Sequence, residues 1–234
     1  MRNIEEKYPV GRLICLSILV ILFFPAVIII LSGNLLWIEG WILSLWFDFM
    51  MLSNIFYMYK KNPALISERL NAHGAQNQKK WDRYLLTILF LLSAFWISSM
   101  PLDSQRFSLS PRFPIFIQII GFILLIPSYY LLVRATIDNP YLSTVVRIQS
   151  DRKQQVISTG LYGVIRHPQY LGIVTLIICG PLILGSIIGL IIGICIVAII
   201  LVRIDGEEKM LIEELEGYDE YRQRVKYRLL PLIW

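Results

Sequence analysis

Residues 160–172 read GLYGVIRHPQYLG, and an apolar stretch begins at Tyr170 and continues to Val202. One helix needs roughly 20 residues to cross the hydrocarbon of a bilayer, so this stretch is too long for one helix and short for two. Gly180-Pro181 and Gly185 lie near its middle, where a helix is readily interrupted. We therefore predict a tight hairpin of two helices, at about 170–184 and 186–205. The alternative is one long tilted helix that is kinked at Pro181.

Polar residues stand at the N-terminal end of this hairpin. Arg166 and His167 precede Pro168, and a proline disfavours helical geometry in the residue before it and suits the first turn of a helix. The backbone amides of that first turn form a helix N-terminus, which attracts a carboxylate. In a purely structural interpretation, Arg166 and His167 are interfacial anchors and Tyr170 belongs to an aromatic belt.

A second polar group, Arg203, Asp205, Glu207 and Glu208, follows the hairpin. Both ends of a hairpin return to the same side of the membrane. We therefore expect the two glutamates to lie within reach of His167. A solvated helix start is the structural alternative, because acidic residues complement the helix dipole there.

The rest of the chain is also mostly apolar. Of its 234 residues, 56% are hydrophobic and 17% are charged, a composition beyond that of an ordinary soluble domain. The fold class we predict is all-α, a polytopic membrane helical bundle with about six spans, the last two of which form the hairpin. The first span reads as a retained helix and not as a removed signal peptide. The other four spans are expected at 11–32, 35–59, 84–100 and 113–133.

Positive charge is distributed unevenly between the predicted loops. Of the 22 Lys and Arg residues, Arg106 and Arg112 lie in the loops that join spans one and two or three and four. The other 20 fall in the N-terminal segment, in residues 60–83, in 134–169 and from Arg203 onward. With six helices these four segments share one side, which the positive-inside rule assigns to the cytoplasm. Both termini and the polar site are therefore predicted to be cytoplasmic, and the net charge of +5 fits an anionic membrane face. Nucleic acid is not an expected partner, because no basic stripe with interleaved aromatics is present.

The chain is expected to form one integral membrane domain, 1–234. It comprises four N-terminal spans in 1–133 and a core in 134–234, and its loops are too short to hold a separate domain. The C-terminal segment is predicted to be a cytoplasmic helical segment. Its first helix follows the last span and ends at Gly217, a second runs through 219–225, and Pro231 stops it.

Other polar residues in the first half carry weaker signals. Asp48 lies inside the second span and should face other helices or a cavity, because a charge near mid-membrane is costly. Glu39 is expected near the outer surface and His73 in a solvated loop. The three cysteines stand inside apolar runs and are expected to be packing residues. We predict no metal site, because two distant histidines and no clustered cysteines leave no ligand set.

The C-terminal 80 residues or so resemble a known family. The similar residues are the segment from Gln154 through Tyr162 to Gly172, then Arg203, Glu207-Glu208 and Leu211, and finally Gly217-Tyr218, Tyr221, Val225 and Pro231. In order and spacing they resemble the isoprenylcysteine carboxyl methyltransferase and phospholipid methyltransferase superfamily. A looser similarity to bacterial members of this group covers 62–70 and Lys80-Trp81-Asp82.

The resemblance implies an integral membrane methyltransferase that binds S-adenosylmethionine at the cytoplasmic face. It implies that Arg203 faces the methyl acceptor, as the catalytic residue, and that Glu207 holds polar groups of the cofactor. The cofactor-binding residues that it implies are Gln154, Gln155, Val156, Ile157, Tyr162, His167, Pro168, Gln169, Tyr170, Glu207 and Glu208.

The residues themselves are compatible with this chemistry. Methyl transfer from a sulfonium is an in-line displacement, so the protein mainly has to position the donor and the acceptor and exclude water. A carboxylate can accept hydrogen bonds from amino or ribose groups, and an arginine can orient an anionic acceptor. We expect the partners to be membrane lipid and a lipophilic or small-molecule acceptor. A prenylcysteine carboxylate, a phospholipid amine, an isoprenoid carboxylate and a thiol are all compatible.

Two other functions remain open at this point. A membrane reductase related to the sterol reductases, which would use NADPH, ends in a pattern similar to Tyr227–Pro231, but the Arg-His-Pro motif and the Glu-Glu pair argue against it. A non-enzymatic membrane component or small transporter is disfavoured, because no inverted repeat and no paired charges across several spans are present.

Overall fold

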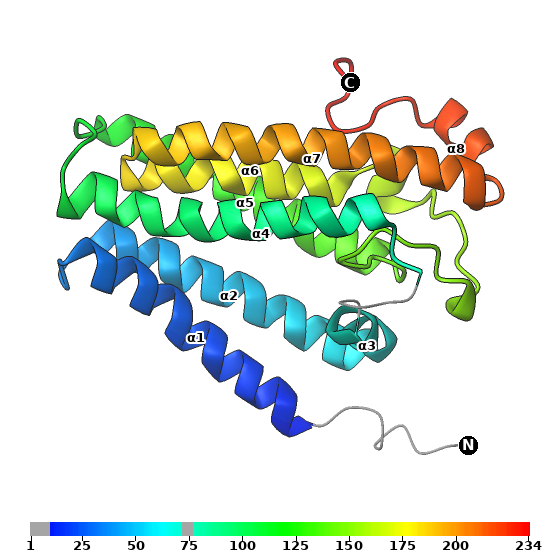
Figure 1. Ribbon diagram of the computed structural model, residues 1–234, viewed down its shortest axis with the longest axis horizontal. Helices are drawn as coiled ribbons and strands as arrows, with labels where there is room; N and C mark the ends of the chain where they lie inside the picture. The colour runs from blue at the N-terminus through cyan, green and yellow to red at the C-terminus, as the bar shows by residue number, and fades with distance from the viewer. Residues whose placement is uncertain (1–9, 72–76) are drawn as a thin grey trace.

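The computed structural model describes residues 10–71 and 77–234. Its long helices run side by side along one axis, and Figure 1 shows the chain crossing this bundle repeatedly between two ends. The helices are α1 (Val10–Ser32), α2 (Ile38–Lys61), α3 (Pro63–Asn71), α4 (Lys80–Pro101), α5 (Ile115–Asp138), α6 (Pro168–Leu184), α7 (Ile187–Glu214) and α8 (Tyr218–Arg224).

Five of these helices, α1, α2, α4, α5 and α7, are long and apolar enough to cross a membrane. The sixth apolar helix, α6, has 17 residues and packs in the bundle between α5 and α7. The prediction of an all-α, polytopic membrane protein is confirmed. His73 lies outside the described residues.

The hairpin is present, and the turn lies at Gly185. This residue has a φ of +72°, which favours glycine, and Ser186 caps the next helix by accepting a hydrogen bond from the Gly189 amide at 2.9 Å. Asp103, which follows α4, accepts hydrogen bonds from the Ser186 hydroxyl at 2.6 Å and from the Ile188 amide at 3.2 Å. Pro181 lies within α6. The alternative of a single kinked helix is therefore wrong.

Two local predictions differ from the structure. The last span and the first C-terminal helix form one continuous helix, α7, because the junction carries no proline and Gly206 packs on the ring of Trp81. Part of the segment from 60 to 83, which we expected to be a loop, forms α3, with Pro63 in its first turn.

Small residues bring α5 and α6 into close contact. A Cβ added to Gly172 would meet Leu132 at 2.8 Å, and the Ser128 hydroxyl donates to the Gly172 carbonyl at 2.8 Å. Membrane helices pack closely where small residues let their backbones approach. The carboxyl end of α5 and the amino end of α6 are thereby held together at one end of the bundle.

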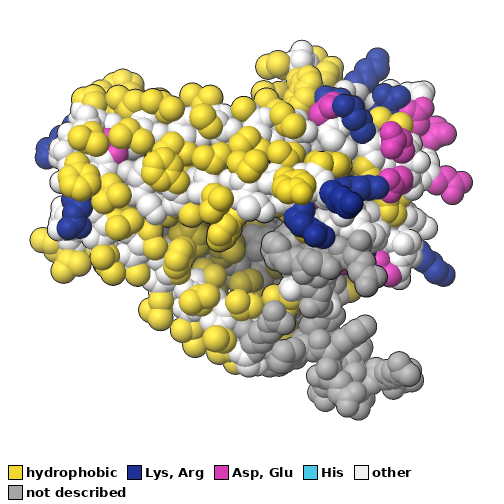
Figure 2. Space-filling view, in the orientation of Figure 1, with side chains coloured by type: hydrophobic (Ala, Val, Ile, Leu, Met, Phe, Trp, Pro, Cys, Tyr) yellow, Lys and Arg dark blue, Asp and Glu magenta, His cyan; other side chains and the backbone are white. Residues whose placement is uncertain are grey.

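The surface of the bundle matches a membrane protein. Figure 2 shows hydrophobic side chains along the middle of the molecule and many Lys, Arg, Asp and Glu side chains gathered at one end. Asp48 is buried, as predicted for its position, at 5% exposure. Cys179 is buried, as expected of a packing residue, whereas Cys15 and Cys195 are exposed, so the prediction that the cysteines are packing residues is wrong for those two.

Candidate functional site

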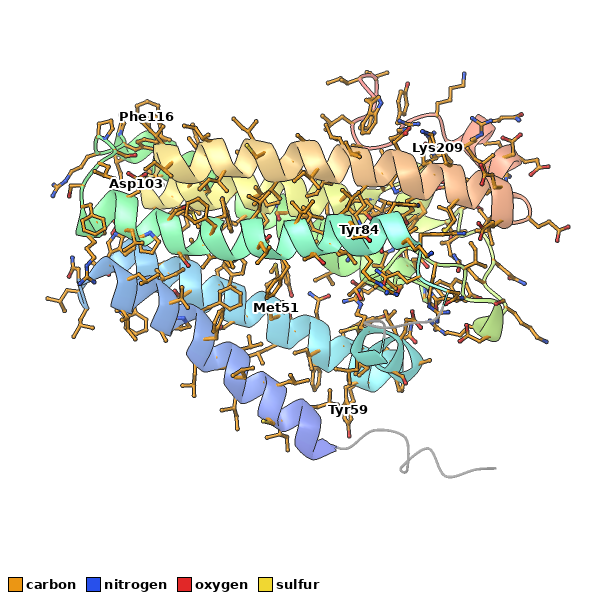
Figure 3. The ribbon with its side chains drawn as sticks, in the orientation of Figure 1. Met51, Tyr59, Tyr84, Asp103, Phe116 and Lys209 are labelled. Carbon is orange, nitrogen blue, oxygen red and sulfur yellow. The ribbon has the colours of Figure 1, made fainter. Side chains whose placement is uncertain are left out.

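A cavity of about 350 Å³ lies at the charged end of the bundle. Its volume falls in the range of about 300 to 1,000 Å³ that is typical of small-molecule sites. In Figure 3 this is the end where Lys209 of α7 is labelled, whereas Asp103 marks the opposite end. The walls come from Leu86 of α4, the 139–157 segment that follows α5, the turn before α6, the N-terminal part of α6, the C-terminal part of α7, and α8. Segments far apart in the sequence therefore meet around one space.

Glu207 and Tyr170 meet across the hairpin. The Tyr170 hydroxyl donates a hydrogen bond to Glu207 Oε2 at 2.7 Å, and both residues line the cavity. Glu207 Oε1 has no hydrogen-bond partner among the described residues. The carboxylate is therefore held in place by one oxygen and can accept a ligand's hydrogen bonds with the other.

Arg203 lies one turn before Glu207 and is fixed by Asp82. Its Nε donates to Asp82 Oδ1 at 2.8 Å, its Nη2 donates to the Thr144 carbonyl at 2.8 Å, and its guanidinium lies 5.7 Å from the centre of the Tyr170 ring. Asp82 is fully buried and also accepts from the Val146 amide at 2.8 Å. The charge of Arg203 is thus neutralised inside the protein, and its Nη1 makes no hydrogen bond with the described residues.

Glu208 has a different environment from Glu207. It forms hydrogen-bonded contacts with Arg166 Nε at 2.5 Å, His167 Nε2 at 3.1 Å and Arg228 Nε at 2.7 Å. It is 2% exposed and is absent from the cavity wall. The His167 amide also donates to the Arg228 carbonyl at 2.9 Å. Glu208 therefore joins the turn before α6 to the C-terminal segment.

Tyr162 carries an unusual hydroxyl. The residue is 6% exposed and lines the cavity, yet its hydroxyl has no hydrogen-bond partner of good geometry in the described part of the chain. Burial raises its pKa well above the ordinary value, an effect that the nearby Asn139 side chain partly offsets. The backbone around it is well held, because Tyr221 donates to the Tyr162 carbonyl at 2.7 Å and the Leu161 amide donates to Asp138 at 2.9 Å.

The 139–157 segment is fastened to the first half of the chain. Arg147 donates to Glu68 of α3 at 2.9 and 2.5 Å, and Asn77 donates to the Ile148 carbonyl at 2.9 Å. Within the segment, Gln154 accepts from the Gln149 amide at 2.8 Å. These contacts fix a wall that has no long helix of its own.

The structure brings most of the predicted site residues together. Ten of the twelve line the cavity: Gln154, Gln155, Val156, Ile157, Tyr162, His167, Gln169, Tyr170, Arg203 and Glu207. Pro168 and Glu208 do not line it; Pro168 starts α6, as its position predicted, and Glu208 is enclosed by basic side chains.

Sequence reasoning missed several residues of the site. Asn139, the 141–147 segment and Tyr218 line the cavity, and Asp82 supports it from behind. Asp82 was part of the looser similarity at Lys80-Trp81-Asp82, but the span was expected to begin at residue 84, so the position of Asp82 in the first turn of α4 was not predicted. No comparable signal marked the 141–147 segment, which mixes apolar and polar residues and lacks periodicity.

The comparisons with known proteins agree with this geometry. Residues 116–213 match the sequence model of the isoprenylcysteine carboxyl methyltransferase (ICMT) family. The chain is similar in fold to the structure of the eukaryotic intramembrane Ras methyltransferase ICMT (isoprenylcysteine carboxyl methyltransferase). The TM-score is 0.54 at 15% identity, and the match covers 96% of this chain and 84% of that chain. No curated protein matches the sequence significantly. The family match favours a methyltransferase over a reductase and over a non-enzymatic membrane component.

Proposed function

We propose that this chain is a methyltransferase of the isoprenylcysteine carboxyl methyltransferase type, whose family model residues 116–213 match, and that its cavity holds S-adenosylmethionine, the cofactor of that family, beside a lipophilic methyl acceptor. The observation that carries this proposal is the convergence of Glu207, Tyr170 and Tyr162 on one cavity of about 350 Å³. These side chains come from two helices of the hairpin and the turn before it.

The polar atoms of the cavity fit the cofactor. The free oxygen of Glu207 is an acceptor for amino or ribose groups, and the unpaired Tyr162 hydroxyl can donate or accept. The side-chain amides of Gln155 and Gln169 line the cavity and make no hydrogen bond with the described residues. Gln155 is exposed and Gln169 and Glu207 are half-buried, so Tyr162 is the buried member of this set, and buried polar groups in proteins are normally hydrogen-bonded. Open polar groups around one space therefore support a polar ligand there.

The bound cofactor supplies an electrophilic methyl group on a sulfonium. The transfer is an in-line displacement, so no protein nucleophile is required, and the residues of the chain have to orient the two reactants and exclude water. Arg203 is held rigidly by Asp82 and Thr144 with Nη1 left over. We assign Arg203 to orienting the acceptor.

An apolar wall supports access from the membrane. Leu86 of α4 and Ile173 of α6 line the cavity, and α4 is long enough to span the bilayer. A lipophilic acceptor can reach the cavity between such helices without entering water. The cavity end carries most of the basic residues, which supports a cytoplasmic position for it and for both termini.

A methyl-transfer assay tests this function. Purified protein in lipid nanodiscs receives S-adenosylmethionine with a labelled methyl group and, in parallel, N-acetyl-S-farnesylcysteine, phosphatidylethanolamine or a long-chain thiol. We expect label in one of these acceptors, and much less label with Glu207→Gln. NADPH-dependent reduction of a sterol is measured beside it. Label in no acceptor, or NADPH consumption instead, would contradict the proposal.

A further inference from the structure

In residues 10–71 and 77–234, three arginines with little-exposed side chains pair with carboxylates, whereas a fourth, part-buried arginine does not. Arg147 pairs with Glu68 at 2.5 Å, Arg166 with Glu208 at 2.5 Å and Arg203 with Asp82 at 2.8 Å. A buried charge is stable only when it is paired and hydrogen-bonded, so such pairs are expected. The exception lies close to the candidate site.

Arg69 is this part-buried arginine without a carboxylate partner. It stands in the last turn of α3, and its Nε donates to the Leu142 carbonyl at 3.3 Å. Its Nη2 is buried and has no hydrogen-bond partner, and it forms no ion pair with any carboxylate in residues 10–71 and 77–234. Burial lowers the pKa of Arg69, and the Tyr162 phenol is the group that acts in the opposite direction. Arg69 is therefore a part-buried positive charge that no carboxylate of the described residues compensates.

Arg69 and the cavity are linked by two residues. Leu142, whose carbonyl accepts the Arg69 hydrogen bond, lines the cavity, and so does Tyr162. The Tyr162 hydroxyl is also buried without a partner of good geometry. Tyr162 thus places one unsatisfied donor in the cavity wall, and Arg69, which does not itself line the cavity, lies behind Leu142 with a second, cationic one. An anion accepts from donors of both kinds.

We propose that Arg69 and Tyr162 form an anion subsite at the edge of the cavity, which receives a carboxylate or a group of similar chemistry from a bound ligand. This proposal rests on the proposed function, which supplies two sources of such a group. One is the amino-acid carboxylate of the cofactor, and the other is an acid group on the acceptor. Arg203 is a weaker candidate for this role, because Asp82 already neutralises its charge.

The first test separates a binding role from a structural one. Replacing an arginine that stabilises the fold should lower the thermal unfolding midpoint. We expect this for Arg147→Gln. Removal of an uncompensated buried charge should leave the midpoint of the ligand-free protein unchanged or raise it. We therefore expect Arg69→Gln to be at least as stable as the parent protein. A drop as large as that of Arg147→Gln would overturn the proposal.

The second test uses two ligand pairs in each of which only one member carries a free carboxylate. Calorimetry in nanodiscs compares S-adenosylhomocysteine with 5′-methylthioadenosine, which lacks the amino-acid part, and N-acetyl-S-farnesylcysteine with its methyl ester. We expect Arg69→Gln to weaken binding of the acid in one pair about tenfold or more, and to spare its neutral partner. The pair that responds identifies the source of the anion. Tyr162→Phe should weaken the same acid, and Arg83→Gln, which removes an exposed charge after the start of α4, should change neither.

The outcomes are distinguishable from a failure of the proposed function. If the parent protein binds neither S-adenosylhomocysteine nor 5′-methylthioadenosine, the cofactor assignment fails, and the farnesylcysteine pair alone decides the subsite. Unchanged affinity for both acids in Arg69→Gln, or equal losses for the acids and their neutral partners, would overturn the anion subsite.

Discussion

Two adjacent glutamates have different environments. Successive residues on an α-helix point about 100° apart, so Glu207 faces the cavity while Glu208 faces the turn before α6 and the C-terminal segment. A sequence motif that contains both cannot separate the two roles. The contacts support Glu207 as a ligand-binding residue and Glu208 as a residue that holds His167 and Arg166 in position.

Asp82 supports the part of the site that Arg203 and the 139–157 segment form. It accepts from Arg203, the Val146 amide and Gln78 at 2.8, 2.8 and 3.0 Å. We expect Asp82→Ala to lower the free energy of unfolding by about 3 to 5 kcal/mol, because it leaves a buried arginine without its partner. Denaturant unfolding of the detergent-solubilised protein measures this.

Asp219→Ala is the matched control. Its pair with Arg222 is exposed on α8 and should contribute less than about 1 kcal/mol. If Asp82→Ala and Asp219→Ala are equally mild, Asp82 does not support the site as described.

At the scale of single elements, the hairpin turn depends on one glycine. A non-glycine residue in the left-handed region is strained by about 1 to 2 kcal/mol, and a Cβ at Gly185 would otherwise meet only Phe113 at 3.9 Å. We expect Gly185→Ala to lower the free energy of unfolding by about that amount. Gly11→Ala, in the open first turn of α1, should be neutral or stabilising. Equal effects of the two substitutions would argue against the turn at 185.

The contact between α3 and the 139–157 segment should depend on pH. Burial alone would raise the pKa of Glu68, but hydrogen bonds from Arg147 and Ser143 outweigh it, and the pKa lies below its ordinary value of 4.5. Such a carboxyl contributes stability that is complete above the unfolded pKa and is lost as pH falls through the folded pKa. We expect the unfolding midpoint to fall below about pH 4.5, and Glu68→Gln to be less stable at pH 7 and less sensitive to acid. An identical pH profile for the variant would contradict this.

The elements with strong signals were predictable, and the connections were not. Long apolar runs and the glycine at 185 identified the spans and the hairpin, because bilayer thickness and backbone sterics act locally. The motif from Gln154 to Tyr170 identified one part of the cavity wall. By contrast, α3 and the fold of residues 141–147 depend on contacts such as Glu68–Arg147, which join residues 79 apart in the sequence, and no local pattern specifies them.

At the scale of the whole molecule, the two ends of the bundle differ in charge. Arg106 and Arg112 are the basic residues in the loops at the end that Asp103 marks, whereas the cavity end carries many charged side chains (Figure 2). We expect cysteines introduced at Ser108 and Glu216, in a background without the native cysteines, to label from opposite sides of intact membrane vesicles, with 216 cytoplasmic. Labelling of both from one side would contradict the six-helix arrangement.

The central claim is that the cavity at this end binds S-adenosylmethionine through Glu207. Calorimetric titration of the protein in nanodiscs with S-adenosylhomocysteine tests it most directly, with NADPH as the competing ligand. We predict saturable binding of one S-adenosylhomocysteine per chain and none of NADPH, a loss of about 1 to 3 kcal/mol in Glu207→Gln, and no loss in Glu213→Gln, which is exposed on the same helix. Absence of binding by the parent protein, or equal losses in the two variants, would contradict the claim.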